Sequence, residues 1–516
     1  MGDPRICPDR FGQPPGGGTW LTNTRRTAGY RSNGKLRGVQ LISSIARRTR
    51  TITFYVLTFL IVTAAASWLA LRVTPLQTVS AAGQTAQVGA TLPNASIKGP
   101  GELDLFGQAM PTRPEFTGPI RPLLELEHIS ISPQVVQVLR SDGSQKVKLT
   151  LSQQLADGWE RCFLWETLIA AGFAAVPLIA IAAVRKKPKI WKLVAAGVAV
   201  VCVVNVGGIL LTASGTPKTL RSVKTLDDLA GVDPLVEPPA AGKPQPGVQA
   251  VVIGDSTASG WGLPWVPDPT GLDKACGRSA DAYSSDLATA NDWNVLNVAC
   301  GSATITNGLL GPQVLYNGEI APPQLPEAEA ATHAKVIIVS VGADDLQWGV
   351  LTQLCVATQV CNDKVSSAYF RQLLDNFTRS YYELLSDLVR LPNHPAVLIN
   401  EYYDPFGTSV GCLRQYGITP AKEKVLVSQL GQLNTVLAQG ASSFGLGVAA
   451  PQFTGHELCT QDPYVQGPGD PAPLHPNADG QLAIALADEQ ALPTLTPAPV
   501  VLPTPSPSVT QQSALG

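Results

Sequence analysis

The sequence predicts a three-layer α/β/α domain in the second half of the chain, preceded by three membrane-spanning helices and a small β-rich domain. Three observations lead to this fold class. Apolar strand patterns alternate with helical patterns in the second half, three long apolar stretches lie in the first half, and one segment between them alternates with period two. With 516 residues, the chain is also too long for one ordinary domain.

Three stretches are predicted to cross a membrane, at residues 53–72, 164–184 and 190–213. Each has about 20 mostly apolar residues, the number that crosses a hydrocarbon core of roughly 30 Å. A buried helix of a soluble domain is the alternative, and it is strongest for the second stretch, which is rich in Ala and Gly and contains Pro177. A cleaved signal peptide is the alternative for the first, but its apolar run exceeds the usual length of about 7–15 residues.

Basic residues orient the predicted spans. Residues 1–52, expected to be a disordered tail, carry many arginines, and Arg185-Lys186-Lys187-Pro188-Lys189 form a short loop between the second and third spans. Because cytoplasmic loops carry an excess of Lys and Arg, both regions are expected in the cytoplasm. Residues 73–163 and everything after residue 213 are then extracytoplasmic, which makes the chain a multi-pass protein of the plasma membrane. The Ala-, Gly- and Pro-rich composition favours a bacterium with a high-GC genome as the source.

The predicted outer segments differ in character. Residues 73–163 alternate at Leu124–Ile131 and Lys146–Leu151, with Ser141-Asp142-Gly143 as a turn, so a small β-rich domain is expected there. Residues 214–247 are Pro-rich and predict a stiff linker. Residues 493–516 form another Pro-rich segment and predict a disordered tail.

Residues 248–492 carry the α/β pattern. Short apolar runs predict strands at Val248–Ile253, Val295–Ala299, Val336–Val341, Ala396–Ile399 and Leu446–Ala450. Helical patterns fill the gaps at Asp281–Thr289, Ser366–Leu391, Lys422–Ala438 and Gly480–Glu489. Continuous apolar strands that alternate with helices indicate a parallel sheet covered on both faces. In such sheets a binding site lies at the carboxyl ends of the strands.

The cysteines test the predicted topology independently. Six of the nine lie in the proposed outer α/β domain, namely Cys276, Cys300, Cys355, Cys361, Cys412 and Cys459. An even set in one domain is typical of an oxidising compartment. Six cysteines allow 15 pairings, and the sequence alone does not choose among them. Our expectation is sequential pairing, first with second, third with fourth, and fifth with sixth. Since no CxxC pair is present, a zinc site is not expected. No cofactor is expected either.

A candidate nucleophile follows the first strand of this domain. Val248–Ile253 leads into Gly254-Asp255-Ser256, and Gly260 comes four residues later. A serine at this place would lie at the edge of the sheet where a ligand binds, and it would need a base to become a useful nucleophile. The alternative is a helix N-cap, which Asp255 or Ser256 could also supply.

In this context the chain resembles the SGNH hydrolases, also called GDSL esterases and lipases, over residues 248–492. Gly254-Asp255-Ser256 matches the first motif block of that family, and Gly301 matches the glycine of the second. Gly342-Ala343-Asp344-Asp345 nearly matches the Gly-x-Asn-Asp of the third, and His475 matches the late histidine. The multiple-cysteine pattern resembles a secreted actinobacterial branch of the family.

The resemblance implies a flavodoxin-like three-layer fold and a role for each matching residue. Ser256 would attack an ester carbonyl, and His475 would take its proton and return it to the leaving alcohol. The N–H groups of Ser256 and Gly301 and the side chain of Asp344 would hold the oxyanion.

Two departures from the family pattern stand out. The third block has Asp344 where the family has asparagine, and an ionised carboxylate would repel an oxyanion unless it were protonated. Ala472 occupies the place of the triad aspartate three residues before His475, and Asp470 lies five residues before it. Asp470 or a backbone carbonyl could orient the imidazole. His456 is the alternative base, although it lacks the Pro-Asn that follows His475.

The function implied by the resemblance is hydrolysis of acyl esters, with a cell-envelope lipid or glycan as the expected substrate because the enzyme would be tethered to the membrane. An acyltransferase, in which a sugar hydroxyl replaces water, is one alternative. A non-catalytic SGNH-fold binding module is another, and Asp344 favours it. A transporter is disfavoured because the uninterrupted apolar stretches at residues 53–71, 167–184 and 193–213 contain no acidic or basic residue that would mark a pathway. The net charge of −2, without a basic patch, excludes a nucleic-acid partner.

Overall fold

The protein is described here from a computed structural model. Its described residues are 63–81, 84–93, 96–129, 144–185, 190–223 and 244–495, with residues 228–229 and single residues between 49 and 61. The predicted span at residues 53–72 therefore lies partly outside them, and the predicted turn at residues 141–143 lies wholly outside them.

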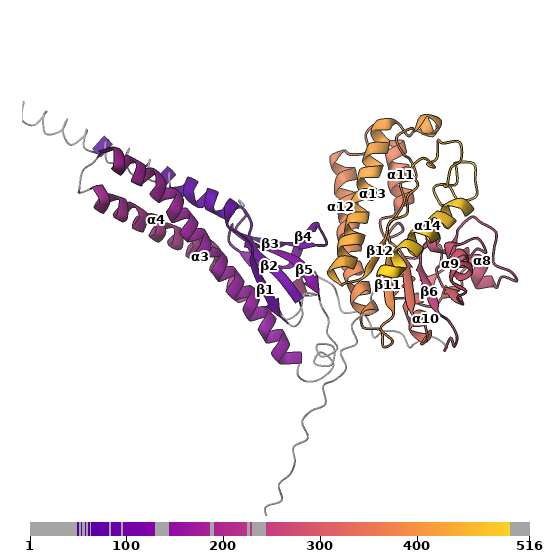
Figure 1. Ribbon diagram of the computed structural model, residues 1–516. Helices are drawn as coiled ribbons and strands as arrows, with labels where there is room; N and C mark the ends of the chain where they lie inside the picture. The colour runs from indigo at the N-terminus through magenta and orange to yellow at the C-terminus, as the bar shows by residue number, and fades with distance from the viewer. Residues whose placement is uncertain are drawn as a thin grey trace, which may run out of the picture. The chain divides into compact units, whose positions relative to one another are not determined.

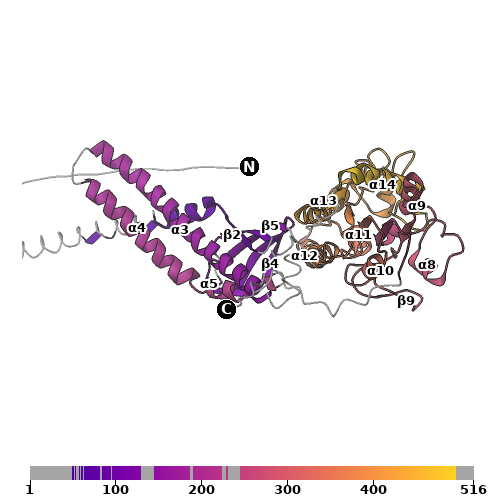
Figure 2. The ribbon, with the colours of Figure 1, turned by 60° about the horizontal axis from the view of Figure 1, so that its bottom comes forward.

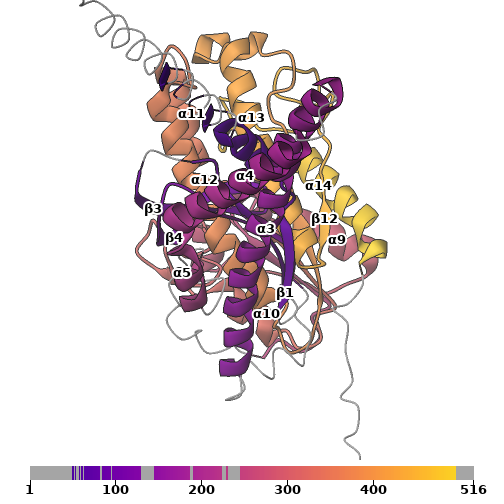
Figure 3. The same ribbon diagram turned by 90° about the vertical axis from the view of Figure 1, so that its left-hand side faces the viewer.

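A five-stranded sheet occupies the N-terminal part of the described chain. Its order is β1-β2-β5-β3-β4, with β1 (Gln77–Ala81), β2 (Gln84–Ala90), β3 (Lys98–Leu105), β4 (Gln108–Thr117) and β5 (Pro122–Ile129). Alternate residues of β3 are buried, as expected for a sheet with one covered face. The long helix α3 (Ser144–Arg185) runs along β1 and β2 and buries Trp159 against this sheet (Figure 3).

Helix α3 corrects one prediction. Its first turns include Lys146–Leu151, which the alternation of apolar and polar residues predicted as a strand. Six alternating residues are a short pattern, and the good helix formers Gln153, Gln154, Leu155 and Ala156 follow immediately, so the helical preference of the longer segment prevails. Helices α4 (Ile190–Ala213) and α5 (Thr216–Ser222) follow, and α4 packs along α3.

A buried polar contact joins α3 and α4. Glu166 is 1% exposed and accepts hydrogen bonds from Asn205 Nδ2 at 3.2 and 3.0 Å. Among the described residues, no single helix is both long and apolar enough to cross a membrane. The segments Gly197–Leu211 and Thr216–Ser222, bent by 47° with respect to each other, meet that criterion only as a pair. The three spans remain a prediction.

The C-terminal half contains a parallel sheet of order β12-β11-β10-β6-β7. Its strands are β6 (Ala250–Gly254), β7 (Val295–Asn297), β10 (Val336–Ser340), β11 (Ala396–Asn400) and β12 (Gly447–Ala449). All five predicted strands are therefore present, with ends within two residues of the predicted ones. The register pairs Gly254 with Ser340, so the carboxyl ends of β6 and β10 meet at one edge.

Helices cover both faces of this sheet, as Figure 1 shows. On one face Val251, Ile253 and Val339 pack with residues of α12 (Lys364–Leu388) and α13 (Pro420–Ser443). On the other face Val252 and Ile338 pack with residues of α9 (Tyr283–Asn291) and α14 (Ala478–Ala491). Because successive strand side chains point to opposite faces, strands buried on both faces read as continuous apolar runs. The predicted three-layer α/β/α fold is confirmed for this half.

Shorter elements complete the domain. They are α7 (Ser256–Ser259), α8 (Gly271–Cys276), β8 (Gln313–Val314), β9 (Ile320–Ala321), α10 (Gln324–Ala330), α11 (Trp348–Ala357) and the 3₁₀ helices at Gly411–Tyr416 and Leu492–Thr494. Figure 2 shows α9 beside α14, on the side of the domain away from α12. The side chains of Asp363 and Asn477 cap α12 and α14, which explains where these helices begin.

Three disulfides join the six cysteines of this half in sequential order. They are Cys276–Cys300, Cys355–Cys361 and Cys412–Cys459. The expected pairing is thus confirmed. The first bond attaches the loop after β7 to the end of α8, directly before Gly301.

Candidate active site

Ser256 lies at the carboxyl end of β6, on a sharp turn into α7. Gly254 has a φ of 152°, and a Cβ there would lie 2.1 Å from the carbonyl oxygen of Ser340 on β10. Asp255 then caps the helix by accepting a hydrogen bond from Thr257 N at 2.9 Å. The glycine therefore allows the chain to turn close to β10, and the serine side chain emerges at the edge of the sheet.

His475 is held on a loop that precedes α14, and Gln466 organises this loop. The Gln466 side chain donates to the carbonyl oxygens of Trp261 and Pro476 at 3.0 and 3.1 Å, and its backbone N–H donates to His475 O at 2.7 Å. Leu474, with a φ of 73°, reverses the chain just before the histidine. These bonds connect the histidine loop to the chain that follows Ser256.

The structure brings the predicted nucleophile and base together. His475 Nε2 lies 2.8 Å from Ser256 Oγ, and His475 Nδ1 lies 3.2 Å from the backbone oxygen of Pro473. A carbonyl oxygen can only accept, so Nδ1 carries the proton and Nε2 is left to accept from the serine. Burial lowers the pKa of His475 below its ordinary value of 6.5, which keeps the imidazole neutral.

Asp470 occupies a different place from the one a triad acid would need. Its Oδ2 accepts a hydrogen bond from the backbone N–H of Gly467 at 2.6 Å, within its own turn. The ring of His475 instead contacts the Pro473 carbonyl. Of the two orienting groups considered from the sequence, the geometry favours the backbone carbonyl.

The second and third motif blocks lie close to Ser256 along the sheet edge, but their donors are arranged differently from the expectation. The N–H of Gly301, expected to face an oxyanion, donates to Cys276 O at 2.9 Å. The indole of Trp261 covers the Gly301 backbone, since a Cβ there would lie 2.5 Å from the ring. The N–H of Ser256 has no hydrogen-bond partner in the described part of the chain, so it is the free donor of the set.

Asp344 is partly buried, and its Oδ2 is buried without a hydrogen-bond partner among the described residues. Burial raises its pKa to about 6. The neighbouring Asp345 is held by the Ile305 N–H at 3.1 Å, and burial raises its pKa to about 7. Burial and the charge of Asp344 also raise the pKa of Asp255 well above its usual range. An acid with no donor around it, next to other acids, favours its protonated form.

Sequence reasoning did not single out Tyr402, which joins these groups. Its hydroxyl donates to Asp255 Oδ2 and accepts from the N–H of Ala343 at 3.0 Å. Tyr402 follows the strand β11 by two residues, at the same carboxyl edge as Ser256. That position was the signal that could have found it.

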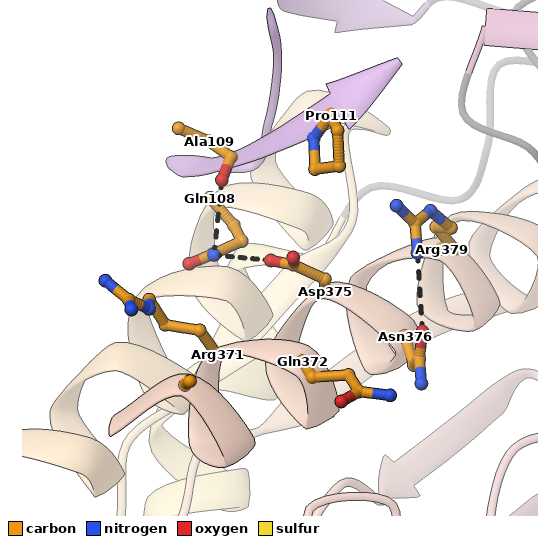
Figure 4. Close-up of a pocket in the computed structure, with 9 residues that line it drawn as sticks. Gln108, Ala109, Pro111, Arg371, Gln372, Asp375, Asn376 and Arg379 are labelled. Carbon is orange, nitrogen blue, oxygen red and sulfur yellow. Dashed lines mark hydrogen bonds between the residues drawn. The ribbon is translucent and has the colours of Figure 1, made fainter. Parts of the chain in front are cut away.

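The remaining candidates lie elsewhere. The ring of His456 stacks on Tyr464 with centroids 3.9 Å apart, and its Nδ1 lies 2.8 Å from Asp462 O, so it does not replace His475. A hollow of about 390 Å³, drawn in Figure 4, is lined by residues of β4 and α12 and includes none of the candidate catalytic residues. Within the described ranges, no group of His, Cys, Asp and Glu could hold a metal ion.

Known proteins resemble this half of the chain. A model of the GDSL-like lipase/acylhydrolase family matches residues 252–483. Lipase 1 of Streptomyces coelicolor is 26% identical over 243 residues, which are 45% of this chain and 81% of that protein.

Solved structures are similar over the same share of the chain. An extracellular lipase from Streptomyces rimosus is 19% identical with a TM-score of 0.37, over 47% of this chain and 99% of that one. A phospholipase A1 from Streptomyces albidoflavus NA297 is 21% identical with a TM-score of 0.36, over 48% and 99% respectively.

Proposed function

We propose that this chain cleaves carboxylic acyl esters with Ser256 as nucleophile and His475 as general base. Its residues 252–483 belong to the GDSL-like lipase/acylhydrolase family, which makes the chain an ester hydrolase. The observation that carries the proposal is the contact of 2.8 Å between His475 Nε2 and Ser256 Oγ. A hydroxyl becomes a useful nucleophile when a positioned base takes its proton. The neutral imidazole is in the state that this step requires.

The reaction follows from this geometry. His475 Nε2 takes the Ser256 proton as Oγ attacks the ester carbonyl, and the imidazolium then protonates the leaving alcohol. Water repeats the two steps on the acyl-enzyme, which releases the acid and restores Ser256. The Pro473 carbonyl keeps the ring in the required tautomer throughout, so a Ser–His dyad without a carboxylate is sufficient.

The developing oxyanion needs hydrogen-bond donors. The N–H of Ser256 is one, and Asp344 in its protonated form is the second. Gly301 joins them only if its N–H leaves the carbonyl of Cys276. Each donor of this kind is worth about 10²–10³ in kcat. The alternative of a non-catalytic module rests on Asp344 being ionised, and a raised pKa weakens that alternative.

The test is hydrolysis of p-nitrophenyl acetate and butyrate by the full chain. Ser256→Ala and His475→Gln are expected to lower kcat roughly 10⁴-fold or more. His456→Gln is the matched control and is expected to retain wild-type activity, because that ring stacks on Tyr464 away from the serine. Equal rates for wild type and Ser256→Ala in folded protein would refute the assignment.

The same proposal places the catalytic domain outside the cytoplasm on a membrane anchor. Three disulfides support an oxidising compartment. Apolar side chains stand exposed on α4, with Val203 at 71% and Leu211 at 87%, and such a surface favours lipid over water. Carbonate extraction of cell membranes tests whether the chain is integral to the membrane. Protease digestion of intact spheroplasts tests whether the catalytic domain lies outside the cytoplasm. Release by carbonate, or protection from added protease, would contradict it.

For the substrate we propose acyl esters of cell-envelope lipids or glycans. A tethered enzyme reaches the envelope without diffusing away, and the relative named Lipase 1 supports a lipid acyl ester. Incubation of membranes with wild type and with Ser256→Ala, followed by analysis of the released acids, tests this assignment. Identical acid profiles would exclude envelope esters.

A further inference from the structure

Two carboxyl groups share one buried space beside Ser256, and their hydrogen bonds differ. Asp255 is fully buried and accepts from the N–H of Thr257 at 2.9 Å and from the hydroxyl of Tyr402. Asp344 Oδ2 is equally hidden from solvent, but no donor in the described part of the chain reaches it. Hydrogen bonds to an ionised carboxylate stabilise its charge. The negative charge is therefore better held on Asp255 than on Asp344.

The charges around Asp344 also disfavour an ionised carboxylate at that residue. It is faced by Asp255 after β6, by Asp345 in its own loop and by Tyr402 after β11. No described Lys or Arg forms an ion pair with these acids. Burial raises the pKa of Asp344 to about 6, and burial together with the charge of Asp344 raises the pKa of Asp255, so around pH 6 the two carboxyl groups hold a proton between them.

We propose that Tyr402 is a positioning residue that keeps the negative charge of this pair on Asp255 and leaves the proton on Asp344, where it can be donated to the oxyanion. Tyr402 suits this role because its hydroxyl contacts the chain segments that carry both acids. It donates to Asp255 and accepts from the N–H of Ala343, one residue before Asp344. Asn434 on α13 fixes its backbone with hydrogen bonds of 2.9 and 2.7 Å. The assignment rests on the proposed esterase function.

The consequence is a defined change in the pH dependence. Without its hydroxyl, residue 402 gives Asp255 one donor fewer, so the shared proton moves towards Asp255 and Asp344 ionises at lower pH. The alkaline limb of the kcat profile should then move about one unit or more towards acid, with a loss of roughly tenfold or more above neutral pH. A purely structural defect would lower kcat by the same factor at every pH.

The experiment compares pH profiles of kcat for p-nitrophenyl butyrate in the full chain. The variants are Tyr402→Phe, Asp344→Asn and the double variant, with Tyr381→Phe as the matched control. Tyr381 is buried like Tyr402, but its hydroxyl donates to the carbonyl of Leu437, away from these acids. We expect an acid shift in Tyr402→Phe, an unchanged profile in Tyr381→Phe, and no shift from Tyr402→Phe in the Asp344→Asn background, because an amide does not titrate.

A shift of equal size in both backgrounds, or a uniform loss at every pH, would overturn the role of Tyr402. Infrared difference spectra provide a readout that does not need turnover. We expect a protonated carboxyl band at and below about pH 6 that is missing in Asp344→Asn and altered in Tyr402→Phe. If the wild type is inactive but this pattern appears, the proposed function fails while the charge assignment stands. An unchanged band in Asp344→Asn would overturn the assignment itself.

Discussion

Replacement of Asp344 by Asn should remove the alkaline limit on activity. The wild-type acid can donate to the oxyanion only while it is protonated, and burial raises its pKa to about 6. A group with a raised pKa keeps its proton below that value and loses it above. At pH 8 about one molecule in 100 would carry the proton, so the variant is expected to be roughly 100-fold faster than wild type there.

At acidic pH the two proteins should converge. Around pH 5 Asp344 is mostly protonated, so kcat of the variant should equal that of wild type within a fewfold. The acid limb belongs to His475, whose pKa is lowered by burial, and it should be the same in both proteins. Wild type is thus active only in the narrow pH range between the titration of His475 and the titration of Asp344. The activity of the variant is limited only on the acid side, by His475.

The assay is kcat as a function of pH for p-nitrophenyl butyrate, with the product read at its isosbestic wavelength. Asp344→Ala is the matched control, because it removes the charge without supplying a donor, and it should be about 10²–10³-fold slower than Asp344→Asn at all pH values. If Asp344→Asn were no faster than wild type at pH 8, or if Asp344→Ala matched it, Asp344 would not belong to the oxyanion site.

Three further outcomes are expected. Asp470→Asn should leave kcat within about twofold, measured by the same assay, because the carboxylate does not contact His475. Asp488→Asn should raise Tm at neutral pH and not near pH 4, since burial raises the pKa of Asp488 and its ionisation destabilises the folded state as pH rises. Removal of the Cys276–Cys300 disulfide, which closes a loop of 24 residues, should cost about 3–4 kcal/mol of unfolding free energy, measured by denaturant titration.

The parallel sheet and the Ser256–His475 pair could be predicted from the sequence for a physical reason. Strands buried on both faces must be continuously apolar, so the strand before Ser256 and the others of its sheet were found. The motifs that follow such strands meet at one edge because parallel strands end there. The pairing of the cysteines was expected only as the simplest order, and the structure agrees with it.

Other features depend on contacts between distant residues, which local patterns do not encode. Tyr402 reaches Asp255 across 147 positions of sequence, and Gln466 reaches Trp261 across 205. The N–H of Gly301 was expected to be free, but the neighbouring disulfide brings the Cys276 carbonyl within its reach. Lys146–Leu151 was wrongly predicted as a strand because a short alternation says less than the helix-forming sequence that follows it.

The most direct test of the central claim is covalent labelling of the full chain with a fluorophosphonate, read by intact mass and peptide mapping. Such reagents react with a serine only where a neighbouring base activates it. We predict one adduct per chain, on Ser256, that is absent in Ser256→Ala and strongly slowed in His475→Gln. Folded protein that takes up no label, or takes it up on another serine, would contradict the assignment of Ser256 as the nucleophile.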